Sequence, residues 1–208
     1  MKNLFIDIET TGTDKDKHGI IQIAGIVEID GCIKKEFDLK VRPFEFQECE
    51  KAALALHGIK EEDLRKYPLP SNGYSVLVSI LDQYVNKFDK VDKFFFVGYN
   101  ATFDFDFLVH FFLNNNDRFY GSYFFWPTVD VAVLAGYLLR KEKHLLANSK
   151  LVTVAEYLGV VGNGEAHDAA YDIKLTYRIF KFLEDKIPEF TSDHGQKVLQ
   201  RRSRWKNI

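Results

Sequence analysis

The sequence predicts an α/β domain built on a mixed β-sheet, and two observations carry this prediction. Three β-type segments fill the chain as far as Val41, and helical patterns then alternate with a fourth strand. This order of elements is typical of helices packed against a sheet whose strands run in both directions. The 208 residues are 46% apolar and 28% charged, as expected for a globular domain that buries its own core.

The strands are expected in four segments. Lys2–Ile8 carries apolar residues on both faces, which is typical of a strand at the centre of a sheet. Ile20–Ile29 and Lys34–Val41 follow, and the Asp30–Gly31 pair between them is a strong hairpin signal. Phe94–Tyr99 is the fourth predicted strand.

The helices are expected mainly in the second half of the chain. Gly73–Phe88 has apolar residues at the period of an amphipathic helix. Phe105–Leu113, Val129–Leu139 and Leu151–Leu158 predict shorter helices. Ala169–Leu183 predicts the last one, with a continuous apolar stripe on its inner face.

The domain is expected to cover residues 1–188, followed by a basic C-terminal tail over residues 189–208. From Gln196 to Ile208 there are five basic residues and no acidic one, so the tail fits either phosphate binding or a solvated terminus. The net charge of −2 does not by itself indicate a polyanionic partner. Cys32 and Cys49 form no metal spacing and no disulfide framework. With no membrane-spanning run and no leader, a cytoplasmic protein without a membrane partner is expected.

Two carboxylates at the end of the first strand are the first candidates for a chemical site. Asp7 and Glu9 are two residues apart, so their side chains leave the same face of the strand. An open α/β sheet binds ligands at the carboxyl ends of its strands. Taken alone, an Asp-x-Glu pair indicates solvated carboxylates, but the apolar run before it implies burial. A buried carboxylate needs a partner or a metal.

Further acidic candidates lie on two other elements. Asp104 follows the Phe94–Tyr99 strand, where it fits either the N-cap of the next helix or a carboxylate aimed at a site. His167, Asp168 and Asp172 surround the start of the last helix. Asp168 is interpreted as structural, because a carboxylate is favourable at a helix N-terminus. Asp172 lies in line with the apolar stripe and is the stronger candidate.

Three acidic sites on separate elements predict a site for a hard divalent cation. Oxygen ligands suit Mg²⁺ or Mn²⁺, and the lack of Cys/His clusters argues against structural zinc. Two such ions about 3.5–4 Å apart can activate a water molecule and stabilise a leaving oxygen. A histidine near such a site can accept the proton of that water at neutral pH.

The motifs resemble those of the DnaQ-like exonuclease superfamily, in its DEDDh branch. Asp7–Gly12 matches the first motif, Asn100–Asp104 the second and His167–Asp172 the third, within a resemblance that runs from about Leu4 to Leu183. Any one motif would be weak, but the ordered combination is highly specific. The resemblance implies a ribonuclease-H-like fold, with a mixed sheet of about five strands flanked by helices.

The resemblance also implies roles for the site residues. Asp7, Glu9 and Asp172 would hold the first of two Mg²⁺ or Mn²⁺ ions, Asp104 would support the second, and His167 would be the general base. The expected contacts with the terminal nucleotide come from Thr10, Thr11, His57 and Asn100. On sequence grounds alone, a histidine before a glycine, as at His57, indicates the end of a helix. Asp130 is expected to be structural.

Two departures from the family pattern accompany the match. Tyr99 stands where many members have histidine before the asparagine. Asn114–Trp126 is rich in aromatic residues, which we interpret as core packing in preference to base stacking.

The expected activity is 3′→5′ exonucleolytic release of nucleoside monophosphates from single-stranded or frayed ends, with DNA favoured over RNA in a proofreading- or repair-like role. The alternatives are an RNA 3′-end-trimming exoribonuclease, an accessory module that docks on a DNA polymerase or replication factor, and an endonuclease like ribonuclease H. Motif order and His167 argue against the last.

Overall fold

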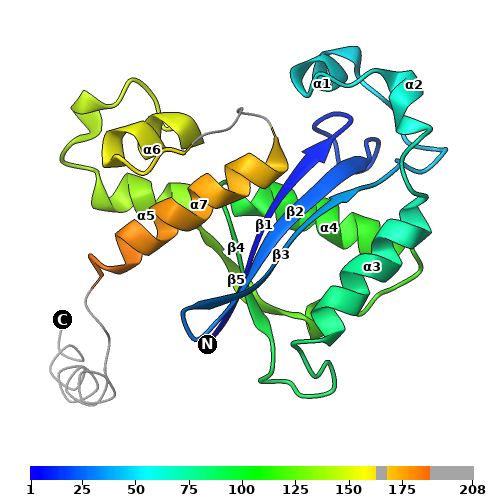
Figure 1. Cartoon of the computed structure of the whole chain (residues 1–208), viewed down its shortest axis with the longest axis horizontal. Coiled ribbons are helices and arrows are strands. Elements are labelled where there is room, and N and C mark those ends of the chain that lie inside the picture. Colours follow the sequence, from blue (N-terminus) through cyan, green and yellow to red (C-terminus); the bar gives the residue numbers. More distant parts are fainter. Residues whose placement is uncertain (163–167, 188–208) are drawn as a thin grey trace, which may run out of the picture.

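Five strands form a mixed sheet in the order β3-β2-β1-β4-β5 in the computed structural model, which describes residues 1–162 and 168–187 (Figure 1). The strands are β1 (Lys2–Thr10), β2 (Ile20–Ile29), β3 (Cys32–Lys40), β4 (Phe94–Gly98) and β5 (Phe124–Asp130). The helices are α1 (Lys51–Leu56), α2 (Glu61–Leu64), α3 (Pro70–Asp82), α4 (Ala101–Asn114), α5 (Val131–Leu138), α6 (Leu151–Leu158) and α7 (Ala169–Glu184), with short 3₁₀ turns η1 (Tyr120–Ser122) and η2 (Lys143–Leu145).

The sheet is antiparallel on one side of β1 and parallel on the other. β1 pairs with β2 and β2 with β3 in antiparallel ladders, whereas β1, β4 and β5 run in the same direction. The β2–β3 hairpin turns at Asp30 and Gly31, with φ of 51° and 77°. Positive φ at both central residues is what the Asp-Gly signal predicts. The mixed sheet with β1 at its centre is thus confirmed.

Helices cover the two faces of the sheet, and β1 contributes to both cores. Leu4, Ile6 and Ile8 point to the face that α3 and α4 cover, which we call the α4 face. Phe5 points to the opposite face, packed against α5, α6 and α7, which we call the α7 face. The alternation follows from the two-residue period of a strand.

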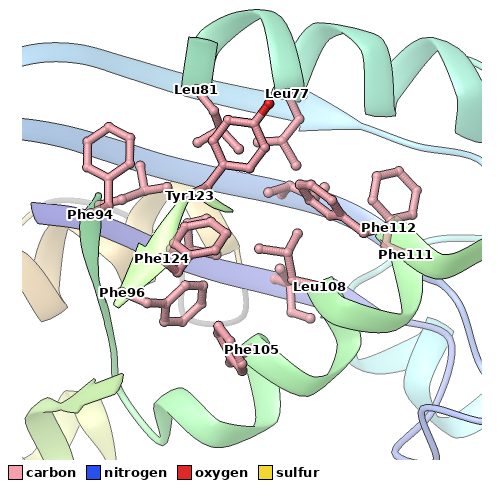
Figure 2. Close-up of a cluster of buried hydrophobic side chains, with 14 of the residues drawn as sticks. Leu77, Leu81, Phe94, Phe96, Phe105, Leu108, Phe111, Phe112, Tyr123 and Phe124 are labelled. Carbon is pink, nitrogen blue, oxygen red and sulfur yellow. The ribbon is translucent and has the colours of Figure 1, made fainter. Parts of the chain in front are cut away.

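Aromatic side chains fill the core of the α4 face. Figure 2 shows them converging from β4, α4 and the start of β5, beneath Leu77 and Leu81 of α3. Phe96 meets Phe105 and Phe124 edge-on, with ring centroids 5.2 and 5.6 Å apart. Edge-to-face contacts of this kind add stability beyond simple burial. The β4–α4 connection therefore rests on a rigid base.

The fifth strand corrects the interpretation of the segment before Asp130. Its residues were expected to belong partly to an aromatic insert and partly to a helix from Val129, but β5 spans Phe124–Asp130 and the helix begins at Val131. The Asp130 carboxylate accepts hydrogen bonds from the backbone N–H groups of Ala132 and Val133, which sets the helix start. Pro127 is compatible with β5 because this is an edge strand.

Two helix boundaries also differ from expectation. The helix expected at Gly73–Phe88 begins at Pro70 and ends at Asp82, and Phe88 is 89% exposed. The apolar pattern extends beyond the end of the helix at Asp82 because a turn after the helix still buries Val85. α4 begins one turn earlier than expected, at Ala101.

The expectation for the aromatic segment is confirmed only in part. Tyr123 and Phe124 are buried in the core, whereas Phe119 and Trp126 are 72% and 74% exposed. His167 and the basic tail lie outside the described residues. None of the helices in residues 1–162 and 168–187 combines the length and apolar character needed to cross a bilayer.

Candidate active site

The candidate site lies where the three parallel strands end together. Asp7 and Glu9 are near the end of β1, Asn100 and Asp104 follow β4, and Asp130 ends β5. Because parallel strands point their carboxyl ends to one edge, residues far apart in sequence meet there. A register shift between Glu9 and Thr10 in the β1–β2 ladder marks the same edge. Such bulges re-aim side chains beside functional sites.

Three carboxylates converge on this edge from the α7 face. Asp7, Glu9 and Asp172 each offer a ligand oxygen, and these oxygens all lie within 4.8 Å of one another. Edge-on contacts of Phe5 with Tyr177 and Phe180, at 5.0 and 5.2 Å between ring centroids, seat α7 across β1. This packing brings the first turn of α7, and Asp172 with it, to the end of β1.

Asp104 reaches the same edge from the α4 face. Its side chain is 4% exposed, and its Oδ1 accepts a hydrogen bond from the Ile8 N–H, 3.1 Å away, between the two acidic residues of β1. The N-cap of α4 is Asn100, and Asp104 lies in the first turn instead. The N-cap interpretation of Asp104 is therefore wrong, because its carboxylate is used across the sheet edge.

Burial and nearby negative charges make the carboxyl groups of Asp7, Glu9 and Asp104 weak acids. Desolvation raises the pKa of Asp7 well above its usual range, with further increases from Asp104, Glu9 and Asp172. Desolvation also raises the pKa of Glu9 to about 8, and Asp172 and Asp104 add to the rise. Burial raises the pKa of Asp104, although N–H donors oppose the shift. The site therefore favours protons or cations between its oxygens.

His57 contacts this cluster from the end of α1. Its Nδ1 lies 3.0 Å from Glu9 Oε2, and both side chains are largely buried. His57 is also the C-cap of α1, and Gly58 after it has a φ of 65°. The helix-end interpretation is thus confirmed, and the same turn brings the imidazole to Glu9.

The threonines after Glu9 are tied into the loop that closes β1. Thr11 is fully buried, and its hydroxyl donates to the Glu48 carbonyl (2.6 Å) and accepts from the Gly19 N–H (2.9 Å). The Thr10 hydroxyl donates to the Gly12 carbonyl at 2.7 Å. Both side chains hold the loop in shape, and their contact with a nucleotide stays a prediction.

Asn100 connects β4 to α4 in a left-handed conformation. Its φ is 65°, its side chain is exposed, and its N–H donates to Asp130 Oδ1 at 3.1 Å. Asparagine tolerates this region better than most residues. Asp130 thus holds both the Asn100 turn and the start of α5, so the structural role expected for it is confirmed.

Two positioning residues at this edge were missed by sequence reasoning. Gln22, which is 2% exposed and pairs with Glu9 in the ladder, donates through Nε2 to Asp168 Oδ1 at 2.9 Å. Asp168 is the N-cap of α7 and accepts from the Ala170 N–H, which confirms its structural role. His18 is buried against Gly12 and lies 3.2 Å from Glu50. A lone amide within the apolar run of β2 was the available signal for Gln22.

The donor set fits a hard divalent cation. Asp7, Glu9 and Asp172 supply carboxylate oxygens only, and Asp104 adds a fourth acid behind them. Oxygen-only ligands that leave room for water and phosphate match the preference of Mg²⁺ or Mn²⁺. The raised pKa values of Asp7 and Glu9 mean that an ion would replace protons here, as metal ligands require.

Comparison with known proteins identifies an exonuclease family. The family model RNase_T, described as "Exonuclease", matches residues 4–180. Ribonuclease T from Marinobacter nauticus is 27% identical over 182 residues, which cover 84% of this chain and 78% of that protein. Ribonuclease T from Shewanella oneidensis is 27% identical over 199 residues, covering 87% and 81%.

Solved structures share the fold. Escherichia coli exonuclease I in complex with a dT13 oligonucleotide has a TM-score of 0.71 at 22% identity, covering 88% of this chain and 41% of that one. Its zinc-bound complex with single-stranded DNA has a TM-score of 0.74 at 22% identity, covering 90% and 41%. The chain thus spans about two fifths of exonuclease I. The ribonuclease-H-like fold expected from the motifs is confirmed.

Proposed function

Because the chain belongs to the RNase_T exonuclease family, in the DEDDh branch of the DnaQ-like superfamily, we propose that it is a divalent-metal-dependent 3′→5′ exonuclease. Its substrate would be a single-stranded or frayed 3′ end. The observation that carries the proposal is the convergence of Asp7, Glu9 and Asp172 at the end of β1, with Asp104 bonded to Ile8 behind them.

Each site residue has a role in this proposal. Asp7, Glu9 and Asp172 would hold one Mg²⁺ or Mn²⁺, and Asp7 with Asp104 would support a second. When bound, such ions supply an activated water molecule and stabilise the leaving oxygen. The water oxygen bonds to the terminal phosphorus while the bond from phosphorus to the 3′ oxygen breaks. A nucleoside 5′-monophosphate leaves, and the shortened strand keeps a 3′ hydroxyl.

The remaining residues would move the proton and position the strand. His167, outside the described residues, would accept the proton of the attacking water, as the family motif implies. His57 would stand beside the terminal nucleotide, where its 3.0 Å contact with Glu9 couples the bound end to the carboxylates. Thr10, Thr11 and Asn100 would contact the same nucleotide through groups at the strand ends.

A product assay tests the proposal. Matched 5′-labelled DNA and RNA oligonucleotides are incubated with the protein and Mg²⁺ or Mn²⁺, and released mononucleotides are quantified. Wild type should shorten the strand from its 3′ end, and Asp7→Ala should release none while keeping its circular dichroism spectrum. Asp16→Ala, an exposed acid in the loop after β1, is the matched control and should act like wild type. Wild type without product under either metal would refute the proposal, and cleavage of a circular substrate would indicate an endonuclease.

The substrate is either DNA or RNA, and a separate observation favours each. The exonuclease I complexes contain a dT13 oligonucleotide or single-stranded DNA, in line with the expectation of a DNA substrate. The curated relatives carry the name ribonuclease T, which favours RNA 3′-end trimming as the second candidate. The ratio of initial rates on the matched DNA and RNA strands decides between them. A polymerase or replication-factor partner stays a prediction.

A further inference from the structure

A cavity of about 480 Å³ lies on the α7 face and takes no part in the chemistry described above. It is bounded by α5, by the segment that contains η2 and by α6, and Tyr99 forms its wall toward β4. Its volume is in the range that small-molecule sites occupy. We call it the Tyr99 pocket.

The Tyr99 pocket opens on the same face of the sheet as the carboxylates. β1 and β4 are parallel, with Asn3 opposite Phe95 and Phe5 opposite Val97. Continuing this register by two residues places Tyr99 level with Asp7, on a neighbouring strand path about 4.8 Å away. Phe5 and Val97 both point to the α7 face, so Asp7 and Tyr99 do as well. The tyrosine therefore stands between the carboxylates and the cavity.

The lining of the pocket suits a flat ring attached to a phosphate. Ala135, Leu139 and Val154 give it an apolar floor. The Tyr99 hydroxyl donates to the Ser149 carbonyl at 2.6 Å, which fixes the aromatic ring as a wall. Lys143 lies on the rim, and residues 139–150 carry four Lys or Arg side chains but one acidic residue, Glu142. Aromatic faces stack on bases, and cations attract the phosphates of the strand.

The path of the substrate strand directs one particular nucleoside to this pocket. His57 lies beside Glu9 on the α1 side of the carboxylates, and the proposed function puts the terminal nucleotide next to it. In Figure 1, α1 and α6 stand on opposite sides of the N-terminal end of α7. The phosphate that is cut joins the terminal nucleotide to the preceding one. With the terminal nucleotide on the α1 side, the preceding one leaves the carboxylates toward Tyr99.

We propose that the Tyr99 pocket binds the nucleoside on the 5′ side of the scissile phosphate, which becomes the new 3′ end after each cut. The inference rests on the proposed exonuclease function and deepens it. A pocket for this nucleoside would hold the strand in place while the terminal nucleotide departs. It would also make hydrolysis depend on a base that is not itself removed.

Filling the pocket tests the inference. Gly136 lines the cavity on α5, and a Cβ added there would meet no atom within 4 Å, so Gly136→Leu occupies the pocket without a backbone clash. Leucine is also a better helix former than glycine, so the variant should fold. Two substrates are compared: a single-stranded oligonucleotide, and a p-nitrophenyl ester of a nucleoside 5′-monophosphate, which has no preceding nucleoside.

Gly136→Leu should lower the ratio of kcat/KM for the oligonucleotide to that for the ester by about tenfold, the size expected for one stacked base. Val133→Leu, on the exposed side of the same helix, is the matched control and should keep the wild-type ratio. An oligonucleotide with an abasic site at its penultimate position gives a second measurement. Wild type should lose about tenfold in kcat/KM on it, and Gly136→Leu should discriminate far less.

The outcomes separate the inference from the function on which it rests. If wild type hydrolyses neither substrate, the exonuclease function fails and the inference fails with it. If hydrolysis proceeds but Gly136→Leu keeps the wild-type ratio, or wild type ignores the abasic site, the inference alone is overturned.

Discussion

The two faces of the sheet use the same strand for opposite purposes. On the α4 face, Leu4, Ile6 and Ile8 of β1 enter a core dominated by aromatic rings. On the α7 face, Phe5 enters a core, but the next two residues of the same parity are Asp7 and Glu9. One face therefore ends in packed rings and the other in mutually repelling carboxylates. The comparison indicates that packing on the α4 face stabilises the folded domain, whereas repulsion between carboxylates at the edge of the α7 face destabilises it.

The largest expected effect is a loss of stability on the α4 face. Phe112 is fully buried and meets Tyr74 edge-on at 5.3 Å. Phe112→Ala should lower the free energy of unfolding by about 3–5 kcal/mol, as expected for a buried Phe→Ala change. Urea denaturation measures it. Leu113→Ala, the next residue on the helix and 41% exposed, should cost far less. Equal losses would show that the α4 face does not act as the rigid base.

The next effect is a loss of activity with little loss of fold. Asp104→Asn keeps the shape of the side chain but removes its charge behind Asp7. We expect kcat to fall by on the order of 10²–10³-fold, because the charge supports metal-dependent catalysis. Asp106→Asn, two residues further along α4 and ion-paired at 3.8 Å with Lys15, is the control. Near-wild-type kcat in Asp104→Asn would remove Asp104 from the site.

A smaller effect is the pH dependence of metal binding. The pKa of Glu9 is raised to about 8, so at lower pH Glu9 holds a proton that a cation must displace. The raised pKa of Asp7 adds to this competition. Affinity for Mn²⁺ should therefore rise with pH between 6 and 8, by about tenfold per pH unit for each proton displaced, and level off above that range. Isothermal titration calorimetry across this range measures it. An affinity independent of pH would contradict the raised pKa values.

The smallest expected effect is a gain in thermal stability, whereas most substitutions lower stability. A carboxyl whose pKa is raised in the folded state binds protons more tightly there than in the unfolded chain, so stability falls as pH rises from its usual pKa toward the raised value. Asp7→Asn removes this penalty, and the metal-free variant should melt about 2–4 °C higher at pH 7.5, the shift expected for about 1 kcal/mol.

The gain from Asp7→Asn should shrink at pH 5, where more of the wild-type carboxyl groups keep their protons. Saturating Mn²⁺ should reverse the order, because wild type binds the ion more tightly than the variant. Thermal melts with and without metal give both comparisons. A variant less stable than metal-free wild type at pH 7.5 would show that repulsion does not govern this edge.

The bounds of a helix or strand were predicted best where its apolar residues followed a single periodicity. β2 and α6 have the expected bounds because their apolar residues follow one pattern and end at clear signals. β5 was missed because Phe124–Asp130 combines aromatic residues, a proline and the start of the next apolar helix. Its strand identity depends on pairing with β4, which is a long-range contact and leaves no local period.

The sequence predicted which carboxylates form the candidate site, but not which residues contact them. The spacing of Asp7 and Glu9 and the apolar stripe below Asp172 indicated a common edge before any fold was known. Neither pattern could reveal that His57 contacts Glu9, or that Gln22 holds Asp168, because these contacts join segments whose distance depends on the folded sheet. The Tyr99 pocket likewise arises from four separate segments.

The separation of the acidic residues along the chain has a consequence for biosynthesis. Asp7 and Glu9 belong to β1, the first strand of the described domain, whereas Asp172 belongs to α7, the last described helix. The oxygens of the candidate metal site can therefore meet only after the chain from β1 to α7 has been synthesised and α7 has docked on β1. A growing polypeptide therefore holds an incomplete set of candidate ligands, and the proposed nuclease activity would begin only once α7 is in place.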